Sequence, residues 1–267
     1  MPVTLPIYQV DAFADHAFEG NPAAVVPLTT WLSEATLQAI AEENNLSETA
    51  FFVREGGRYR IRWFTPLAEV KLCGHATLAA AHVLFHHMGL ATDSVAFDSP
   101  SGPLSVKRDD DRLTLDFPSQ PPTFCDVPPD LVQGLGVAPT ACLVHADYLA
   151  VYDSEDRVAA IEPHTDALAR LAHRGVIVTA PAQASDVEFV ARFFAPKLGI
   201  AEDPVTGSAY TQLTPYWASR LGRSALEARQ LSRRGGRLAV ADEGDRVLIS
   251  GGAVTYLEGT VTIDREV

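Results

Sequence analysis

The chain is poor in cysteine and methionine, and it contains no long apolar run. Its cysteines are too widely spaced for a CxxC zinc pattern or a disulfide framework; they are Cys73, Cys125 and Cys142. No stretch approaches the roughly 18 apolar residues that a membrane-spanning helix needs. The opening residues Met1–Pro6 lack the basic and apolar segments of a secretory signal. We therefore expect a soluble, cytoplasmic protein without a membrane partner.

Positive charge is also scarce. The chain has 21 Lys and Arg residues against 34 Asp and Glu residues, which gives a formal net charge of −13. A nucleic-acid partner would need a basic surface patch, so we expect none. A small anionic metabolite remains compatible with this charge, because backbone N–H groups at the start of a helix can bind an anion.

Sequence signatures of cofactors and metals are missing as well. The chain has no P-loop and no GxGxxG motif after a strand, so we predict no cofactor. His82 and His86 share one face of a predicted helix, but they lack the Glu and the third ligand of a zinc motif. We therefore predict no metal site and interpret these histidines as exposed residues near the end of the helix.

What the chain does contain is an internal repeat with a period of half its length. Four segments return in the same order, 130 to 134 positions later: Arg62–Pro66 as Arg192–Pro196, Cys73–Ala76 as Thr206–Ala209, Gly102–Val106 as Gly236–Val240, and Asp111–Leu113 as Asp245–Val247. Such a long period excludes a solenoid array. It indicates two similar lobes related by a pseudo-twofold axis, and the cleft between such lobes is a favoured place for a small-molecule site.

Strands dominate the predicted secondary structure, with one long buried helix in each half. The expected strands cover residues 7–13, 23–26, 49–53, 59–64, 95–97, 104–106, 113–117, 142–144, 148–151, 176–179, 189–194, 247–250 and 260–263. The apolar segments Gly74–Gly89 and Gly207–Leu221 predict the two central helices. A further helix is predicted over Ser33–Asn44, with Ser33 as its N-cap.

These elements predict an α+β fold in which each lobe is a mostly antiparallel, barrel-like sheet around its central helix. The proline-rich segment Pro118–Pro122 marks the boundary between the lobes. We expect an N-terminal lobe over residues 1–117 and a C-terminal lobe over residues 123–259. A last strand near residues 260–267 is expected to pack back on the N-terminal lobe.

Both central helices begin at a glycine, and the start of a helix presents unpaired N–H groups and a positive dipole end. Gly74 and Gly207, the latter followed by Ser208, therefore predict two cradles for a substrate carboxylate or a developing enolate. The alternative is that both glycines only permit tight packing.

Glu48 is the candidate general base, because it stands directly before the apolar strand 49–53. Partial burial at a strand entrance suits a carboxylate to proton transfer near neutral pH. The alternative is an exposed or capping glutamate, which is the commoner role of this residue type. The counterpart strand 176–179 carries no carboxylate, which favours a specialised role for Glu48.

Two other residues precede the central helices. Asp203 is either an ordinary loop acid or a group that steers a proton or a substrate amine. Cys73 stands directly before Gly74, where a helix start makes a thiol more reactive. Its repeat partner is Thr206, so a proton exchange between two thiols is not available. We favour a small buried cysteine.

Several motifs, taken together and in order, resemble the phenazine-biosynthesis PhzF-like isomerases and epimerases, which share the two-lobed fold of diaminopimelate epimerase. The resemblance runs almost end to end and is carried by Val10–Phe13, Gly20–Pro22, Asn45–Phe51, Phe64–Pro66, Cys73–Thr77, Ser101–Leu104, Glu202–Ala209 and Arg233–Gly236.

The resemblance implies a cofactor-free enzyme and a homodimer. Glu48 matches the acid/base glutamate of the family. The other polar residues of the family site are matched by His75, Asp203 and Ser208, and its backbone cradle by Gly74 and Gly207. Asn21 and Cys73 lie in the matching motifs and are expected to contact the substrate. The implied reaction is an isomerisation or epimerisation of a small carboxylate-bearing metabolite, by proton abstraction and return.

Two other classes of function stay open at this point. One is a cysteine-dependent racemase or hydrolase that uses Cys73, against which the missing second thiol argues. The other is a catalytically silent scaffold that binds a small molecule. Such a scaffold has no need of a desolvated acid like Glu48.

Overall fold

The computed structural model describes residues 2–264, and the chain divides into two compact units. Unit 1 comprises the residues up to Asp116 together with those from Ser250 onward, and unit 2 comprises Phe117–Ile249. Among the described residues, no helix has the length and apolar character needed to cross a membrane.

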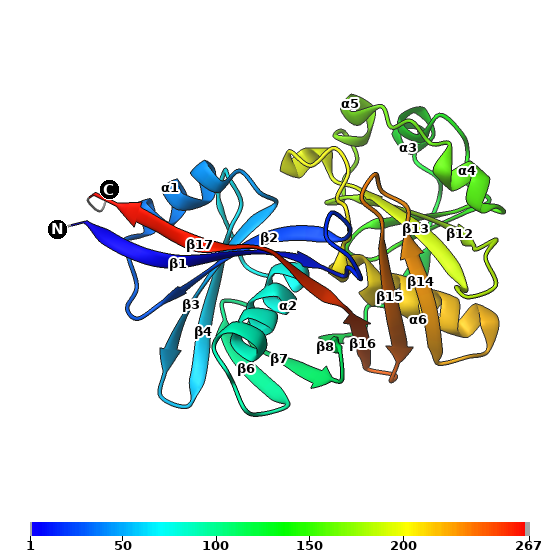
Figure 1. Ribbon diagram of the computed structural model, residues 1–267. Coiled ribbons are helices and arrows are strands. Elements are labelled where there is room, and N and C mark those ends of the chain that lie inside the picture. Colours follow the sequence, from blue (N-terminus) through cyan, green and yellow to red (C-terminus); the bar gives the residue numbers. More distant parts are fainter. Residues whose placement is uncertain (1, 265–267) are drawn as a thin grey trace. The chain divides into compact units, whose positions relative to one another are not determined.

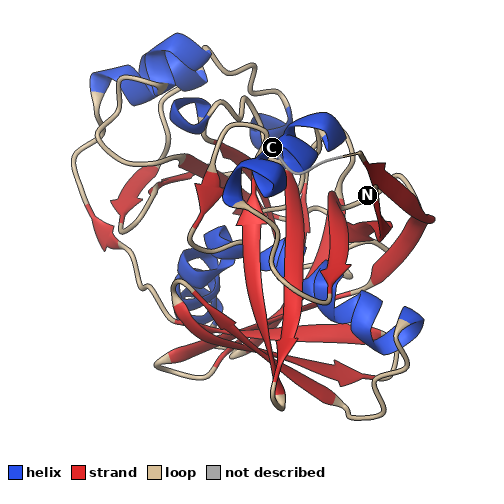
Figure 2. Cartoon of the chain, turned by 90° about the vertical axis from the view of Figure 1, so that its left-hand side faces the viewer, coloured by secondary structure: helices blue, strands red, loops and turns tan. Residues whose placement is uncertain are grey.

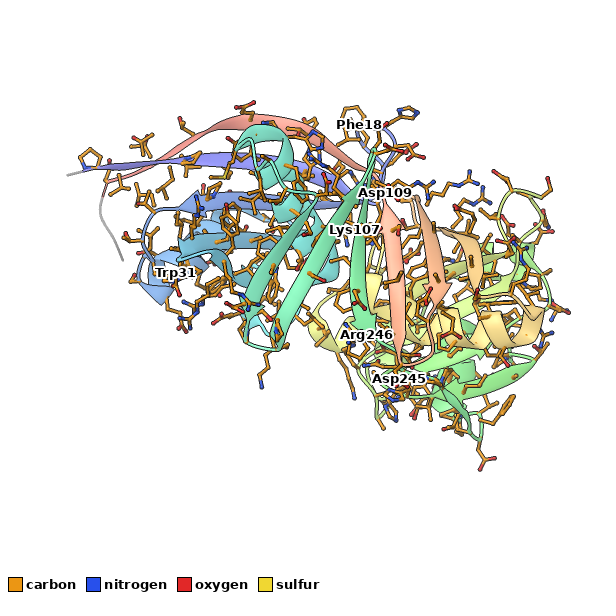
Figure 3. All side chains as sticks on the ribbon, turned by 90° about the horizontal axis from the view of Figure 1, so that it is seen from below. Phe18, Trp31, Lys107, Asp109, Asp245 and Arg246 are labelled. Carbon is orange, nitrogen blue, oxygen red and sulfur yellow. The ribbon has the colours of Figure 1, made fainter. Side chains whose placement is uncertain are left out.

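Strands predominate in unit 1 (Figures 1 and 2). They are β1 (Val3–Ala12), β2 (Asn21–Leu28), β3 (Glu48–Glu55), β4 (Arg58–Phe64), β5 (Glu69–Val70), β6 (Ser94–Ser99), β7 (Gly102–Asp109), β8 (Arg112–Pro118) and β17 (Ala253–Ile263). The helices are α1 (Glu34–Asn44) and α2 (Gly74–His82), which continues into a π-helical turn, η1 (Val83–His87). Side chains alternate along β7: Leu104 and Val106 are buried, whereas Lys107 and Asp109 are exposed (Figure 3).

The first and last strands of the chain lie side by side in unit 1. β17 pairs antiparallel with β1, from Val3 opposite Ile263 to Ala12 opposite Ala253 (Figure 1). The strands follow the order β17-β1-β2-β3-β4-β6-β7-β8. The pairs β2–β3 and β4–β6 are parallel, and the other neighbours in this order are antiparallel.

Unit 2 contains more short helices than unit 1. Its strands are β9 (Thr123–Phe124), β10 (Ala141–Val144), β11 (Tyr148–Val151), β12 (Val176–Pro181), β13 (Phe189–Phe194), β14 (Ala225–Gln230), β15 (Gly236–Asp242) and β16 (Arg246–Gly251), whose last residues belong to unit 1. Its helices are α3 (Pro129–Leu135), α4 (Glu155–Ala159), α5 (Thr165–Leu168) and α6 (Tyr210–Leu221), with 3₁₀ turns η2 (Pro196–Leu198) and η3 (Gly207–Ala209).

The strand pairing of unit 2 repeats that of unit 1. Along β10-β11-β12-β13-β14-β15, antiparallel and parallel pairs alternate as they do along β1-β2-β3-β4-β6-β7. Parallel neighbours need a crossover connection. In both units the second crossover contains the central helix, α2 between β4 and β6 and α6 between β13 and β14. The predicted α+β fold with two similar lobes is confirmed.

The central helices are buried to different extents. α2 packs against β1, β2, β3 and β7, and its residues His75–His82 are all buried, as predicted for a helix that is apolar all round. α6 is buried from Tyr210 to Thr214, but its last three residues, 219–221, are exposed. α1 covers a separate cluster in which Leu37 packs with Phe51 and Phe64. Burying each such side chain contributes about 1.5–3 kcal/mol.

The second unit ends earlier than the predicted boundary at residue 259. Residues from Ser250 onward belong to unit 1, because β17 pairs with β1 from Ala253 to Ile263, with one shift of register between Gln9 and Val10. The strand expected near residues 260–267 does pack back on the N-terminal unit as far as Ile263. Residues 265–267 of that prediction lie outside the described residues.

The interpretation of His82 as an exposed residue is wrong. His86 is exposed, but only 8% of His82 is exposed. Its Nε2 lies 2.9 Å from the hydroxyl Oγ1 of Thr255 on β17, a strand 173 residues away in the sequence. This strand lies over the helix end, and the local sequence around His82 gives no sign of it.

Candidate active site

The predicted site residues of unit 1 come together where three elements begin. Asn21 is the first residue of β2 and Glu48 is the first residue of β3. These strands are parallel, with Ala23 opposite Glu48, so both begin at the same edge of the sheet. Cys73 and His75 lie at the start of α2, which packs on both strands. The fold therefore gathers these four side chains in one place.

His75 is the centre of this cluster. Its Nε2 lies 3.0 Å from Oε2 of Glu48. On the other side of the ring, Nδ1 lies 3.2 Å from Nδ2 of Asn21 and 3.6 Å from Sγ of Cys73. All four residues are buried, and Glu48 is only 9% exposed. The alternative of an exposed surface glutamate is therefore excluded.

Asn21 can serve either protonation state of the ring. Its amide N–H donates to Nδ1 of a neutral imidazole, and its amide oxygen, after rotation of the side chain, accepts from the N–H of an imidazolium. The backbone before it is fixed by Gly20, whose φ of +64° and close approach to Ala12 admit no side chain: a Cβ there would lie 2.2 Å from the carbonyl oxygen of Ala12.

The charges of the cluster follow from burial and proximity. Burial lowers the pKa of His75, but its hydrogen-bonding neighbours Cys73 and Glu48 raise it, and the net pKa lies well above the usual value. Burial raises the pKa of the Cys73 thiol to about 11, and the Glu48 carboxylate adds to the rise. The thiol is therefore protonated at neutral pH, and Glu48 is the partner that keeps the imidazolium charged.

Cys73 is thus the small buried cysteine that the sequence favours. Burial outweighs the effect of the helix start, which alone would lower the pKa of the thiol. The ligand atoms of Glu48, Cys73 and His75 all lie within 4.8 Å of one another. These three side chains are of types that coordinate zinc, so they could also hold a divalent metal.

The predicted site residues of unit 2 lie in a loop before α6 and in the turn η3. Oδ2 of Asp203 accepts a hydrogen bond of 2.6 Å from the hydroxyl of Thr206. The buried Gln230 of β14 donates from Nε2 to the carbonyl of Asp203 and accepts, at Oε1, from the backbone N–H of Thr206. Asp203 is 9% exposed. The loop that carries this acid is therefore pinned by Gln230.

Ser208 lies beside a charged pair that the sequence analysis missed. Nη2 of Arg174 lies 3.0 Å from Oγ of Ser208. The same guanidinium donates to both carboxylate oxygens of Asp147, over 3.0 and 2.6 Å, and Asp147 is fully buried. Burial lowers the pKa of Arg174, but the hydrogen bonds to Asp147 and attraction to Asp147 and Asp203 raise it above its usual value.

A signal for Arg174 is present in the repeat. Arg174 and Gly175 are the two residues before β12. The equivalent pair in unit 1 is Ser47, just before β3, and Glu48, its first residue. Unit 2 has no carboxylate at this position of the repeat, but it has a charged residue, Arg174, directly before the strand entrance. The structure places Gly207 at the first position of η3, so the second predicted cradle begins as a 3₁₀ turn and not as an α-helix.

Comparisons with known proteins point to one family. The family model of the phenazine biosynthesis-like proteins, PhzC-PhzF, matches residues 10–131 and 137–259. An uncharacterized isomerase of Pseudomonas aeruginosa is 54% identical over 257 residues, which are 96% of this chain and 98% of that protein. The crystal structure of a PhzF family protein of Enterococcus faecalis has a TM-score of 0.95 and 46% identity, with 98% of this chain and 100% of that chain covered.

A more distant similarity concerns the fold alone. The crystal structure of a hydroxyproline epimerase of Agrobacterium vitis matches with a TM-score of 0.62 at 10% identity, with 98% of this chain and 93% of that chain covered. The epimerase type of fold is thus shared well beyond the range of recognisable sequence similarity.

Proposed function

The chain belongs to the phenazine biosynthesis-like (PhzC-PhzF) family, and from this premise we propose that it is an isomerase or epimerase that moves a proton within a small carboxylate-bearing metabolite without a cofactor. The observation that supports the proposal best is the buried contact between Glu48 and His75, with 3.0 Å between Oε2 and Nε2. Relatives are named isomerases.

Glu48 is the proposed base. An Oε atom of Glu48 removes a proton from a carbon next to a conjugated carboxylate or carbonyl group. The electron pair of the broken C–H bond moves onto the oxygen of that group, which gives an enolate. Glu48 then returns the proton, or one exchanged with solvent, to a different carbon or to the other face of the same carbon. No electron is gained or lost, so the proton transfers require only side chains of this type.

His75 is the proposed partner of the base. As an imidazolium in contact with Glu48, it places a positive charge beside this buried side chain, and that charge is close at hand when the enolate forms. Asn21 holds the far side of the ring and fixes its orientation. Cys73 contributes a neutral thiol beside the ring.

The cysteine-dependent alternative has less support. A nucleophilic or proton-abstracting cysteine acts as a thiolate, whereas burial raises the pKa of Cys73 to about 11. The assignment of Asp203, Gly207 and Ser208 to the same substrate as Glu48 stays a prediction, as do the homodimer and the cytoplasmic location.

The test is turnover by a variant of the base. Glu48→Gln keeps the size and hydrogen bonding of the side chain but cannot take the proton, so isomerisation across a panel of small unsaturated carboxylates should fall by at least about 10²-fold. Glu55→Gln, at the exposed far end of the same strand, is the matched control. Equal turnover by Glu48→Gln and the parent protein would remove Glu48 from the mechanism.

A further inference from the structure

The entrance of β12 in unit 2 holds the same place in its fold as the entrance of β3 in unit 1. In unit 1, Phe51 of β3 lies opposite Arg62 of β4. In unit 2, Val178 of β12 lies opposite Arg192 of β13. Because Arg62 and Arg192 are partners in the sequence repeat, Phe51 and Val178 occupy equivalent positions.

This equivalence reveals different chemistry at the two entrances. Three residues earlier, Glu48 corresponds to Gly175, and Arg174 directly precedes that glycine. In unit 1, Glu48 contacts His75. In unit 2, Arg174 donates to Ser208, the repeat partner of His75. Where unit 1 has a carboxylate and an imidazole, unit 2 has a guanidinium and a hydroxyl, which are groups that donate to an anion.

The guanidinium of Arg174 is held on three sides. Its Nε and Nη2 donate to the two oxygens of Asp147, and Nη2 also reaches Oγ of Ser208. The ring of Phe193 lies under it, 5.6 Å from ring centroid to Cζ. Asp147 is held in turn by Nε2 of Gln212, over 3.3 Å. The orientation of the Arg174 guanidinium is thus fixed before any ligand binds, which lowers the entropy cost of binding.

The Nη1 edge of the Arg174 guanidinium is available to a ligand. Nη1 of Arg174 makes no hydrogen bond to any residue from 2 to 264, and 40% of the side chain is exposed. Oγ of Ser208 accepts from Nη2, so its own proton can be donated elsewhere. Two donors, Nη1 and the Ser208 hydroxyl, are therefore available to a ligand at a fixed guanidinium.

We infer that Arg174 and Ser208 form a monocarboxylate-binding subsite in unit 2, in which Nη1 and the hydroxyl donate to the oxygens of the ligand. That this ligand is the substrate rests on the proposed function, whereas the binding itself rests on unit 2 alone. Arginine suits the task because its planar fork matches a carboxylate.

The neighbouring acids set the charge of the ligand. Asp147 already balances Arg174, and Asp203 is near enough to attract the guanidinium electrostatically. These carboxylates repel a ligand with two negative charges more strongly than a ligand with one. The subsite therefore favours a single carboxylate over dicarboxylates and phosphate, which a simple cationic patch would prefer.

The experiment is a ¹H–¹⁵N NMR titration of the full chain with sodium propionate, at an ionic strength held constant with sodium chloride. Sodium succinate and inorganic phosphate are the comparison ligands. Arg174→Lys keeps the positive charge but removes the planar guanidinium with its several N–H donors, and Ser208→Ala removes the hydroxyl. A double variant, Asp147→Asn with Arg174→Gln, removes both charges and avoids leaving Asp147 unpaired in the interior. Arg170→Gln, at an exposed arginine nearby in sequence, is the matched control.

We expect propionate to bind the parent protein more tightly than succinate or phosphate. Arg174→Lys and the double variant should weaken propionate binding at least about tenfold, because a charge-assisted hydrogen bond is lost. Ser208→Ala should weaken it several-fold, and Arg170→Gln should not change it. Because this titration measures binding and not turnover, a failure of the proposed base and a failure of the subsite are separable. Unchanged binding by Arg174→Lys and the double variant, or a preference for phosphate, would overturn the inference.

Discussion

At the scale of single residues, the contact between Glu48 and His75 links stability to pH. The folded-state pKa of His75 is raised, so the pair contributes stability that is fully present below the unfolded-state pKa of about 6.5 and is lost as the pH rises through the raised value. We expect His75→Gln to lower the free energy of unfolding by about 3 kcal/mol near neutral pH, because it leaves Glu48 buried without its charged partner.

Denaturant unfolding of both proteins over a series of pH values measures this effect. The difference between parent and His75→Gln should shrink as the pH rises into the alkaline range. A difference that stays constant from neutral to alkaline pH would mean that His75 is not charged in the folded protein.

His82 has the opposite linkage. Burial is the main cause that lowers its pKa to about 3, and repulsion from His86 and His87 adds to it. Between pH 6.5 and this value the unfolded chain binds one more proton here, so stability falls on acidification by about 1.4 kcal/mol per pH unit. We expect His82→Gln to flatten the acid side of the stability curve by that slope, and the exposed His145→Gln to leave it unchanged. Identical slopes for parent and His82→Gln would refute this linkage.

The sequence revealed those site residues that lie within a recognisable motif and missed those that do not. Glu48 and His75 stand in short recognisable segments, and the structure brings them into contact. Asp147 and Arg174 are 27 residues apart and in no motif, so only the folded chain shows that they form a pair. The burial of His82 was hidden for the same reason, because Thr255 approaches it from the other end of the chain.

At the scale of elements, the N-caps of α1 and α4 are both serines, Ser33 and Ser154, and they can be compared directly. Oγ of Ser33 accepts from the backbone N–H of Thr36 over 3.1 Å, as the sequence predicted, whereas the N-cap Ser154 of α4 makes no such hydrogen bond. We expect Ser33→Ala to lower the free energy of unfolding by about 1 kcal/mol and Ser154→Ala to lower it by much less. Thermal unfolding followed by circular dichroism measures both. A larger loss in Ser154→Ala would show that the cap is not the cause.

The first central helix was predicted as one segment to Gly89, but α2 ends at His82 and η1 follows. Met88 donates to the carbonyl of Val83, five residues earlier, which is the π-helical pattern. The wider turn brings Nε2 of His82 and of His87 to the same hydroxyl, that of Thr255. Apolar periodicity cannot distinguish an α from a π turn. Helices α3, α4 and α5 have seven, five and four residues and are too short to show a period at all.

At the scale of the whole molecule, the two units differ in how the chain builds them. Unit 2 is one continuous segment, Phe117–Ile249, whereas unit 1 needs β17 from the C-terminal end to complete its sheet. We expect a chain of residues 117–249 to fold by itself, because its core cluster is formed within that segment. We expect a chain that ends at Ile249 to lose unit 1, because β1 loses β17, the longer of its two partner strands, and keeps only its pairing with β2.

Amide hydrogen exchange separates these outcomes. The chain of residues 117–249 should protect the amides of β12 and β13, and the chain that ends at Ile249 should protect those of unit 2 but not those of β1. Protected β1 amides in the shortened chain would mean that β17 is dispensable. The duplication and the return of the last strand to the N-terminal unit were both predicted from the sequence. The strand was expected to begin near residue 260, whereas β17 begins at Ala253, because the repeat itself runs only as far as Val247 and does not mark where the strand starts.

The most direct test of proton transfer by Glu48 is solvent deuterium uptake. Small unsaturated carboxylates are incubated in D₂O with the parent protein, with Glu48→Gln or with Cys73→Ser, and deuterium in each compound is measured by mass spectrometry. We predict that the parent exchanges one carbon-bound hydrogen of a compound it isomerises, that Glu48→Gln exchanges it at least about 10²-fold more slowly, and that Cys73→Ser loses far less. Full exchange by Glu48→Gln together with none by Cys73→Ser would contradict the assignment and make Cys73 the base.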